Sequence, residues 1–444
     1  MKKFSSNSSF KIIRVSDKKC QELSFNTYYQ FEAKKFDTIE LSNDKDVYEI
    51  VLENPDIDAI ITQSENKEDR EYENIMKLPN YFKRRWFHFK DYYNHGIDIA
   101  LAITNSQYSG FRRPLFSIVT PLYNTKLEYF KKTYKSLTNQ ILNDWEWILV
   151  DDSPQKLNDV YDFIKKQKDV RLRYYRIKPT HGNIGLSKWR ANCLSNGQWL
   201  IELDHDDMLP YWSLVSIKQA IDAYPNNMFI YSDNGTINEN DMFIGPLYGE
   251  NGFGLGFGFH YDSPLPNGKT EPADASCPIN NATIRHIVGM PNHFRCWNRD
   301  FYFKIGGHNV YQRIADDYEL LVRSFLHTRF THIPISCYYQ RFDGNNSQYN
   351  DKTEVRNIDD IQRRVRLASI YYDEAIHNRL EELGADDSKW IKGDPYETAM
   401  LYHSDYNMKN VEDIFIPEWA KNNMPKIDYK VKPKEENTEN ENNN

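Results

Sequence analysis

Three acidic clusters in this chain contain the residues best able to do chemistry. LDHDD (203–207) places three carboxylates in four positions after an apolar segment, VDDSP (150–154) places two before a turn, and ADDYELLVR (315–323) begins with two more. Carboxylates this close repel one another unless a cation or hydrogen-bond donors offset their charge. The clusters therefore indicate either ion binding and proton transfer or the acidic starts of helices.

The LDHDD cluster gives the sharpest indication. Asp204, Asp206 and Asp207 could hold a hard divalent cation, which binds proteins through one or two carboxylates and takes further oxygen ligands from phosphates. Asp206 or Asp207 could instead begin the helix expected through SLVSIKQAI (213–221), because acids are favoured at helix starts. Spacing alone does not separate these two interpretations.

The other two clusters indicate less by themselves. Asp151 and Asp152 precede a turn, which is a common position for acids in loops. Asp316 and Asp317 either begin a helix or form a pair tuned for proton transfer, since neighbouring carboxylates in an apolar cleft raise one another's pKa. Nucleophilic catalysis has little support, because the sequence contains no G-x-S-x-G elbow and no P-loop.

Strands alternate with helices around these clusters. Three segments are typical of buried strands that end in polar residues: FSIVTPLYN (116–124), WEWILVDDSP (145–154) and QWLIELDHDD (198–207). A segment with the periodicity of an amphipathic helix follows the first of them. This alternation predicts an α/β fold with a Rossmann-like, mostly parallel, doubly wound sheet. Ligands of such sheets bind at the carboxyl ends of the strands, where two acidic clusters lie.

The chain divides by its sequence pattern into four parts. We expect a small N-terminal α/β domain over 1–107, a larger α/β domain over 108–347, a helical extension over 348–430 and a disordered tail over 431–444. A single long helix is expected over 358–384. The glycine-rich segment at 249–260 is either a flexible loop or a lid over a site.

Composition excludes several classes of protein. The 444 residues carry a net charge of −8, which argues against nucleic-acid binding through overall charge. The sequence contains no apolar run of membrane-spanning or signal-peptide length, although peripheral membrane association is compatible with it. Five cysteines without a CxxC pair fit a reducing, cytoplasmic setting. Aromatic residues make up 14% of the chain and could stack on a base or a sugar.

In their order, these segments resemble the family 2 glycosyltransferases with the GT-A fold, over roughly 114–347. FSIVTPLYN, WEWILVDDSP and WLIELDHDDMLP resemble the nucleotide-binding strands and the DxD strand of that family, and NIGLSKWRAN (183–192) resembles its phosphate-side segment. The family's sugar-side strand is similar to IYSDNGTIN in this chain, and its acceptor-side segment is similar to MPNHFRCWNRDFYFKIGGHN. Its catalytic-base segment is similar to IADDYELLVR. The order of the segments is more specific than any one motif.

The resemblance implies a function and a set of site residues. The expected reaction transfers a sugar from a nucleotide-sugar, UDP-linked, to a hydroxyl of a glycan, lipid-linked or protein acceptor, with inversion in a single displacement. The cofactor would be Mn²⁺ or Mg²⁺, held by Asp204, Asp206 and Asp207, and Asp317 beside Asp316 would be the catalytic base. The donor-side residues implied are Thr120, Pro121, Tyr123, Asn124, Asp151, Asp152, Asn183, Arg190, Asp204 and Asp233, and the acceptor-side residues are His293 and Trp297.

One departure from the family pattern bears on the metal. Many relatives have a histidine near YYQRFDGNNS, where this chain has Phe342 and Asp343. Asp343, His308 or water could then provide the third ligand. Two other classes stay open: a catalytically inactive carbohydrate-binding or scaffold protein on the same fold, and a sugar nucleotidyltransferase. The second is disfavoured because TPLYNTKLEYF lacks a glycine-rich basic loop.

Overall fold

The structure, a computed structural model, describes residues 114–425 with gaps and, before residue 114, four strands and Ile50. The gaps are residues 168, 170, 178, 181, 245–258, 282, 287–290, 292, 313–314, 344–353, 386–389, 391 and 393–408. Nearly all of the glycine-rich segment and the expected disordered tail over 431–444 lie outside the described residues. The chain forms two compact units, 1–211 with 296–316, and 212–295 with 317–444.

Four short strands form a separate sheet in the N-terminal part of the first unit. Its order is β2-β1-β3-β4 and every printed pairing is parallel. The strands are β1 (Phe10–Ser16), β2 (Phe36–Leu41), β3 (Ala59–Gln63) and β4 (Trp86–Phe89). The small N-terminal α/β domain expected over 1–107, with its bounds, stays a prediction.

The rest of the first unit is built on a second, mostly parallel set of strands. Four strands pair in parallel in the order β8-β5-β6-β7, and β12 pairs antiparallel with β8. The strands are β5 (Phe116–Leu122), β6 (Trp145–Asp151), β7 (Leu172–Arg176), β8 (Trp199–Glu202) and β12 (Arg295–Asn298). The expected α/β fold with a mostly parallel sheet is confirmed, and the antiparallel β12 is an addition.

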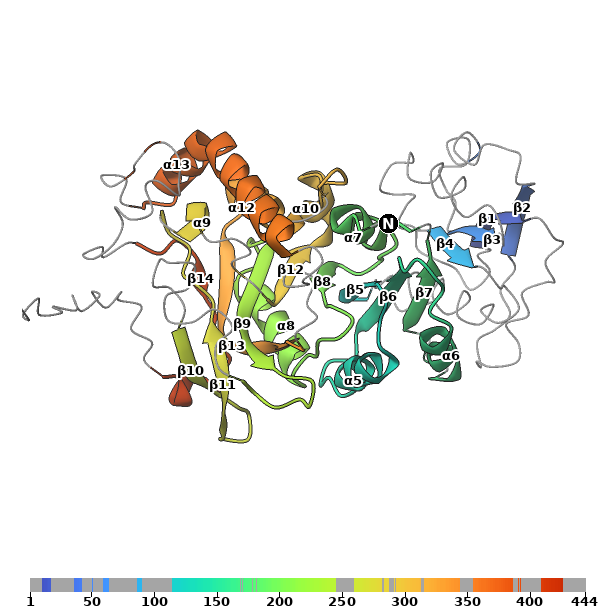
Figure 1. Ribbon diagram of the computed structural model, residues 1–444, viewed down its shortest axis with the longest axis horizontal. Coiled ribbons are helices and arrows are strands. Elements are labelled where there is room, and N and C mark those ends of the chain that lie inside the picture. Colours follow the sequence, from blue (N-terminus) through green and yellow to red (C-terminus); the bar gives the residue numbers. More distant parts are fainter. Residues whose placement is uncertain are drawn as a thin grey trace, which may run out of the picture. The chain divides into compact units, whose positions relative to one another are not determined.

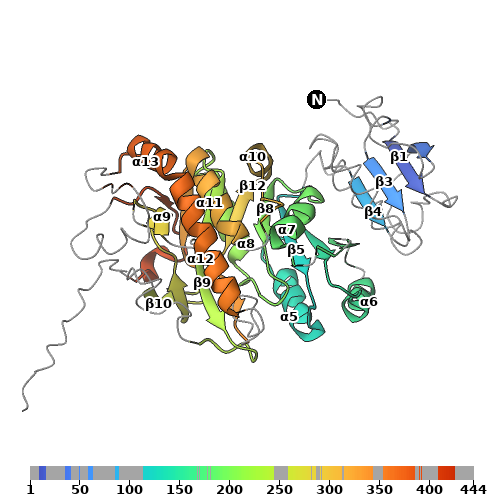
Figure 2. The ribbon, with the colours of Figure 1, turned by 45° about the horizontal axis from the view of Figure 1, so that its top comes forward.

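Helices connect these parallel strands. The helices α5 and α6 lie on one face of the strands and α7 on the other, as Figure 1 and Figure 2 show. The connecting helices are α5 (Leu127–Thr138), α6 (Asn158–Gln167) and α7 (Ile184–Cys193), and a further helix, α10 (Arg299–Lys304), follows β12. Phe130 of α5 stacks on Trp147 of β6 with ring centroids 5.1 Å apart, so this helix is fixed on the strands by an aromatic contact in the core.

The strand order reverses at β5, which creates a topological switch point. The chain runs from β5 to β6 and β7 in one direction and then returns to place β8 on the other side of β5. Ligands of open α/β sheets bind beyond the carboxyl ends of the strands at such a point. The segments that follow β5, β6 and β8 begin at Tyr123, Asp152 and Leu203, so all three predicted donor-side segments lie at this edge.

The second unit has a mixed set of strands in the order β10-β11-β9-β13-β14. β9 pairs in parallel with β13, and β13 in parallel with β14, whereas β11 is antiparallel to both β9 and β10. The strands are β9 (Phe229–Ile237), β10 (Phe259–Pro264), β11 (Thr270–Ala275), β13 (Phe330–Arg341) and β14 (Asp413–Ile414). Every residue of β9 is buried, as expected for a central strand.

The C-terminal region of the second unit contains the helices α12 (Glu354–Tyr371) and α13 (Asp373–Glu382), as expected, but no single long helix spans its described residues. The helices before this region are α8 (Ser213–Ala223), α9 (Thr283–His286) and α11 (Asp316–His327). The single helix expected over 358–384 was wrong, because it breaks at Tyr372. Tyr372 donates to Glu319 at 2.9 Å and Asp373 pairs with the buried Arg285 at 2.5 Å, contacts that helical periodicity does not reveal.

A C-terminal segment is part of the packed second unit. Val411 is 1% exposed and its amide donates to the carbonyl of Ile279 at 2.9 Å. Asp413 accepts from Asn227 at 2.8 Å, and the Trp419 ring packs on Trp212. These contacts connect residues 411–420 to the strands and α8, so the second unit ends well beyond α13.

Removal of residues 409–444 should destabilise the second unit by several kcal/mol, since each buried apolar side chain contributes about 1.5–3 kcal/mol. Urea unfolding measures the change. A chain that lacks only residues 431–444 is the control, because it retains every contact of 411–420. Equal free energies of unfolding for the two shortened chains would contradict a structural role for this segment.

Most large aromatic side chains belong to the core rather than to a stacking surface. Trp145, Trp147, Trp199, Trp212 and Trp297 are each at most 5% exposed.

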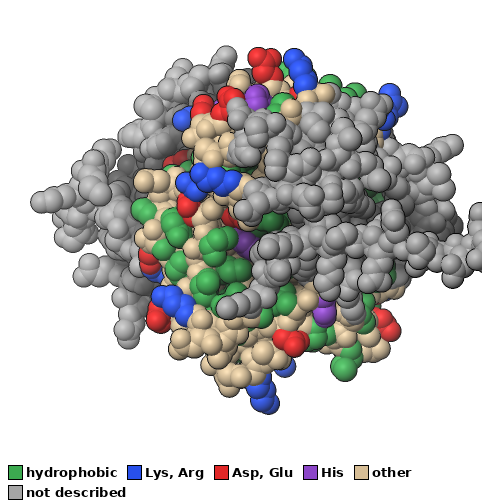
Figure 3. Space-filling model, turned by 90° about the vertical axis from the view of Figure 1, so that its left-hand side faces the viewer, with side chains coloured by type: hydrophobic (Ala, Val, Ile, Leu, Met, Phe, Trp, Pro, Cys, Tyr) green, Lys and Arg blue, Asp and Glu red, His purple; other side chains and the backbone are tan. Residues whose placement is uncertain are grey.

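Figure 3 shows one face of the molecule, on which the described acidic and basic side chains are scattered among apolar ones rather than gathered by sign. None of the helices in the described residues combines the length and the apolar character required to cross a membrane.

Candidate functional site

The loop that follows β8 is held by α5 and by Gln140, which lies just beyond the end of this helix. The Thr133 hydroxyl donates to the carbonyl of Asp207 at 2.7 Å, and the Ser136 hydroxyl accepts from the amide of Leu209 at 3.1 Å. The Gln140 amide donates to the carbonyl of Pro210 at 2.7 Å. Thr133 and Ser136 lie three residues apart on α5, which places them on one side of the helix, and Gln140 follows the end of the helix. This anchoring was not predicted from the sequence.

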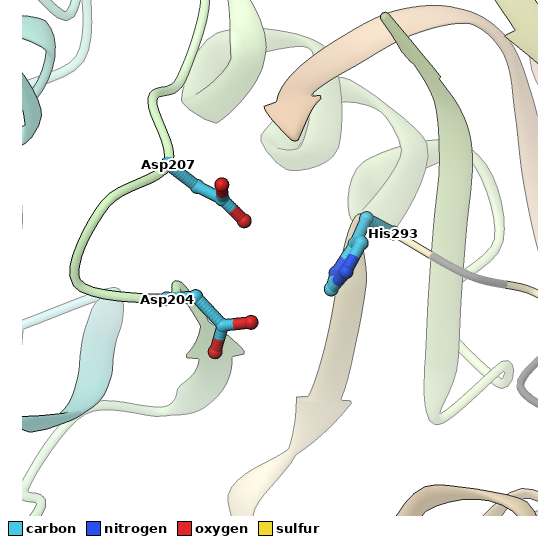
Figure 4. A group of neighbouring side chains, drawn as sticks. All are labelled: Asp204, Asp207 and His293. Atoms are coloured by element: carbon cyan, nitrogen blue, oxygen red, sulfur yellow. The ribbon is translucent and has the colours of Figure 1, made fainter. Parts of the chain in front are cut away.

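Asp204 and Asp207 bring two carboxylates together within this loop. One oxygen of each lies within 4.8 Å of the other, and both side chains point to the same side of the loop (Figure 4). Asp207 is 2% exposed and its amide donates to the carbonyl of Asp204 at 3.3 Å. Asp206 instead has its carboxylate 3.8 Å from His205. A carboxylate pair of this kind offers the hard oxygen ligands that Mg²⁺ and Mn²⁺ prefer.

The charge of Asp204 is strongly affected by its surroundings. Burial raises the pKa of Asp204, the nearby Lys188 opposes that shift, and Asp206 adds to it. Burial penalises the ionised carboxylate, so a cation nearby would relieve the penalty. The local electrostatics therefore favour a positive charge beside Asp204.

At the end of β6, both predicted donor-side acids have partners within the protein. Asp151 is fully buried and accepts from the amide of Ser153 at 3.0 Å and from the hydroxyl of Tyr174 at 2.6 Å, while Arg176 lies 3.2 Å away. Asp152 accepts from the amide of Thr180 at 2.6 Å and from its hydroxyl at 2.5 Å. Their contacts with a nucleotide stay a prediction.

Two other predicted donor-side residues, Asn183 and Arg190, lie near Asp152. Burial raises the pKa of Asp152, and hydrogen bonds from Thr180 and the charge of Arg190 oppose that shift. Asn183 caps α7 by accepting from the amide of Leu186 at 3.0 Å. Arg190 thus provides a positive charge beside an acid at the carboxyl end of the strands, which suits an anionic ligand.

The segment after β5 presents some side chains outward and others to the core. The Thr120 hydroxyl donates to the carbonyl of Leu203 and accepts from the indole of Trp147, so it joins β5 to its neighbours. Pro121 is half-buried, whereas Tyr123 is 45% exposed and Asn124 is exposed with a φ of 49°. Tyr123 and Asn124 are therefore the members of this segment that a ligand could reach.

Asp317 is held by an arginine in the second unit. Its Oδ2 lies 2.9 Å from Nη2 of Arg295, whose side chain is 3% exposed, and its Oδ1 accepts from the amide of Tyr318 at 2.8 Å. The Asp317 side chain itself is 24% exposed. A partly exposed carboxylate with a fixed orientation can accept a proton from a bound hydroxyl group.

Asp233 lies on β9 and has three hydrogen-bond partners within the second unit. It is fully buried and accepts from the hydroxyl of Tyr261 at 2.7 Å and from the amide of Ser276 at 2.8 Å. His332 Nε2 lies 2.7 Å from the same carboxylate. These bonds join β9 to β10, β13 and the segment after β11. Its sugar-side role stays a prediction.

The acceptor-side predictions fall on two buried aromatic rings. His293, also drawn in Figure 4, is 9% exposed and stacks on Tyr338 with ring centroids 4.4 Å apart. Trp297 is 1% exposed and packs against Tyr302 and His308. The contacts of Trp297 are those of a core residue. The acceptor-side roles of His293 and Trp297 stay predictions.

Glu271 on β11 makes the stability of the second unit depend on pH. Burial raises the pKa of Glu271 from 4.5 to about 7, against the hydrogen bond from Tyr339 at 2.6 Å. The folded state therefore holds the proton more tightly than the unfolded state, and the free energy of unfolding decreases as the pH rises from 4.5 to about 7.

Glu271→Gln should remove this loss. We expect the variant to gain about 2 to 3 kcal/mol relative to wild type at pH 8 compared with pH 5, measured by urea unfolding. The exposed Glu239 of the same unit provides the control, and Glu239→Gln should show no such difference. Parallel unfolding curves for wild type and Glu271→Gln at both pH values would overturn the assignment.

Residues 117–247 match the model of glycosyl transferase family 2. This match confirms the family resemblance over the segment that contains the switch point and the Asp204–Asp207 loop. An uncharacterized glycosyltransferase of Haemophilus influenzae is 26% identical over 220 residues, which are 49% of this chain and 64% of the relative.

Two further proteins are similar to parts of this chain. An uncharacterized protein of Sinorhizobium fredii, y4gI, is 30% identical over 129 residues, which are 28% of this chain but 14% of the relative. The crystal structure of Staphylococcus aureus TarS with UDP-GlcNAc aligns with 65% of this chain and 76% of its own at a TM-score of 0.42 and 13% identity. The matched part of this chain thus covers less than two thirds of the Haemophilus influenzae relative and of y4gI.

Proposed function

We propose that this chain is a glycosyltransferase that moves a sugar from a nucleotide-sugar, UDP-linked, to a hydroxyl acceptor. The observation that carries the proposal is the Asp204–Asp207 carboxylate pair. It lies at the carboxyl end of β8 beside a switch point, within a segment that matches glycosyl transferase family 2. The location is the one at which open α/β sheets bind nucleotides.

The donor would lie across the ends of β5, β6 and β8. Tyr123 and Asn124 are exposed there, and Arg190 is positioned to balance negative charge near Asp152. Asp151 would act on the base or ribose through the turn that it holds, because its carboxylate already accepts from Ser153 and Tyr174. The remaining donor-side residues of the first unit, Thr120, Pro121 and Asn183, would act by shaping the backbone around the donor, and Asp233 would act on the sugar side.

Asp204 and Asp207, with Asp206 as a further candidate, would hold Mn²⁺ or Mg²⁺. When bound, the ion would neutralise charge that develops on the departing nucleoside diphosphate. The raised pKa of Asp204 supports this assignment, because burial penalises an ionised carboxylate and a bound cation would offset the penalty. His308 is not proposed as a third ligand: its ring nitrogens lie 2.6 Å from Tyr302 and 2.9 Å from Glu202.

Asp317 would take the proton from the acceptor hydroxyl as that oxygen attacks the anomeric carbon. Its fixed orientation and partial exposure support this role. A single displacement inverts the anomeric centre. His293 would act on the acceptor side.

A cytoplasmic setting belongs to the same proposal. Cys193, Cys277, Cys296 and Cys337 are buried thiols in the part of the chain that the structure describes. Reduced thiols are typical of proteins in a reducing compartment. The acceptor would be a glycan, a lipid-linked sugar or a protein.

Calorimetry tests the donor half of the proposal. UDP should bind to the wild-type chain in the presence of Mn²⁺ and bind more weakly after chelation of the metal. Asp300→Asn, which changes an acid whose side chain is 64% exposed, is a matched control and should bind as wild type does. Binding of a glycan without any binding of UDP would favour the inactive carbohydrate-binding alternative instead.

A further inference from the structure

A buried group of charged side chains lies behind the proposed site in the first unit. Glu202 ends β8, Lys188 lies on α7, His308 follows α10, and Asp316 begins α11. The Lys188 ammonium is 3.2 Å from Asp316 and 3.6 Å from Glu202. His308 Nε2 is 2.9 Å from Glu202 and 3.4 Å from Asp316. One ammonium and one imidazole thus lie between two carboxylates.

The orientation of His308 is fixed from its other side. Its Nδ1 lies 2.6 Å from the Tyr302 hydroxyl, and its backbone amide donates to the same hydroxyl at 3.0 Å. The His308 side chain is fully buried, and those of Glu202 and Asp316 are 9% and 6% exposed. Buried carboxylates are costly unless they are paired, so this arrangement has little freedom to change.

The backbone of α7 packs closely against the segment that ends at Asp316. A Cβ on Gly185 would lie 2.5 Å from the carbonyl oxygen of Asn309 and 2.6 Å from that of Gln312. The Asn183 amide donates to the carbonyl of Val310 at 2.8 Å. Ala315 has a φ of 53°, a conformation that costs a non-glycine residue about 1 kcal/mol and that surrounding contacts must maintain.

We infer that Lys188 and His308 are positioning residues for the proposed catalytic base. They hold Asp316, and the chain passes from Asp316 directly to Asp317, so Asp316 limits the positions open to the base. Glu202 brings the network to the end of the strand that leads into the Asp204 loop. This inference rests on the proposed glycosyltransferase function, and it assigns Asp316 a buried, positioning role beside Asp317.

Lys188→Met and His308→Ala test the inference by the release of UDP from UDP-sugars in the presence of Mn²⁺. We expect kcat to fall about 100-fold, as a small misplacement of a reacting group produces, while KM for the donor changes little. His308→Gln, which keeps a nitrogen donor, should recover part of the lost kcat. Hydrogen exchange of the amides at the start of α11 should rise in the two disruptive variants.

Arg173→Met is the matched control. Arg173 and Glu146 form another buried ion pair of the first unit, at 2.6 Å, between β7 and β6. Its loss should lower the thermal midpoint without the same fall in kcat. Wild-type kcat in both Lys188→Met and His308→Ala, or an equal fall in Arg173→Met, would overturn the positioning role alone. A wild-type chain that releases no UDP from any UDP-sugar would overturn the proposed function and, with it, this inference.

Discussion

Asp317→Asn should lower the turnover of a UDP-sugar by about 10²- to 10⁴-fold, the contribution typical of a general base. The amide cannot accept the proton of an acceptor hydroxyl, yet it is nearly the same size and its oxygen can still accept from Arg295. UDP and metal binding should therefore persist. Turnover is measured by the release of UDP, and binding by calorimetry.

Glu319→Gln provides the control for this variant. Glu319 lies on the same helix and forms an ion pair with Arg323 at 2.6 Å, so it shares the charge and the helix of Asp317 without the proposed role. Thermal unfolding shows whether each chain is folded at the assay temperature. Equal turnover in wild type and Asp317→Asn would remove Asp317 from the mechanism, whatever the behaviour of Glu319→Gln.

Asp204→Asn and Asp207→Asn should each lower metal-dependent turnover by about 100-fold or more, because the ion supplies several kcal/mol of charge stabilisation. Mn²⁺ affinity, measured by calorimetry, should fall in both variants. One carboxylate oxygen of Asp204 lies within 4.8 Å of one of Asp207, whereas the carboxylate of Asp206 is near His205. We therefore expect turnover and Mn²⁺ affinity to fall less in Asp206→Asn than in Asp204→Asn or Asp207→Asn.

The Asp206 variant separates two arrangements of ligands. A loss in Asp206→Asn equal to that in Asp204→Asn would favour the D-x-D spacing that the sequence suggests. Full metal affinity in Asp204→Asn would contradict a metal site in this loop altogether. Asp207 is almost completely buried, so the thermal midpoint of Asp207→Asn must be compared with that of wild type before its turnover is interpreted.

Local patterns were sufficient to predict the strands that carry the site. The apolar segments ending at Asp151 and before Asp204 became β6 and β8, because long buried runs followed by acids and turns have few other solutions in an α/β fold. The carboxyl ends of these strands meet at the switch point for the same reason. The location of the site therefore follows from alternation of strands and helices.

Contacts between residues distant in sequence could not be predicted in the same way. His308 meets Glu202 across more than a hundred residues, and no spacing rule connects them. The break at Tyr372 depends on Glu319 and Arg285, which lie on other helices. Asp233 has the sequence context of a ligand-facing strand end, yet its three partners come from neighbouring segments that only the fold brings together.

The pairing within the acidic loop shows the same limit. Asp204, Asp206 and Asp207 are equivalent in composition, and alternation along the chain gives no reason to prefer one pair. The loop conformation decides it, because Thr133 holds the carbonyl of Asp207 and the Asp207 amide reaches the carbonyl of Asp204. A tight turn of this kind directs the first and last carboxylates to one side.

The most direct test of the central claim is the release of UDP from a panel of UDP-sugars by the wild-type chain, with Mn²⁺ and after chelation of the metal. The account predicts release from at least one UDP-sugar in the presence of Mn²⁺, its loss on chelation, and its near absence in Asp317→Asn. Release that is independent of metal would contradict the role of the Asp204–Asp207 pair. No release from any UDP-sugar would contradict the proposed transfer from a UDP-linked donor.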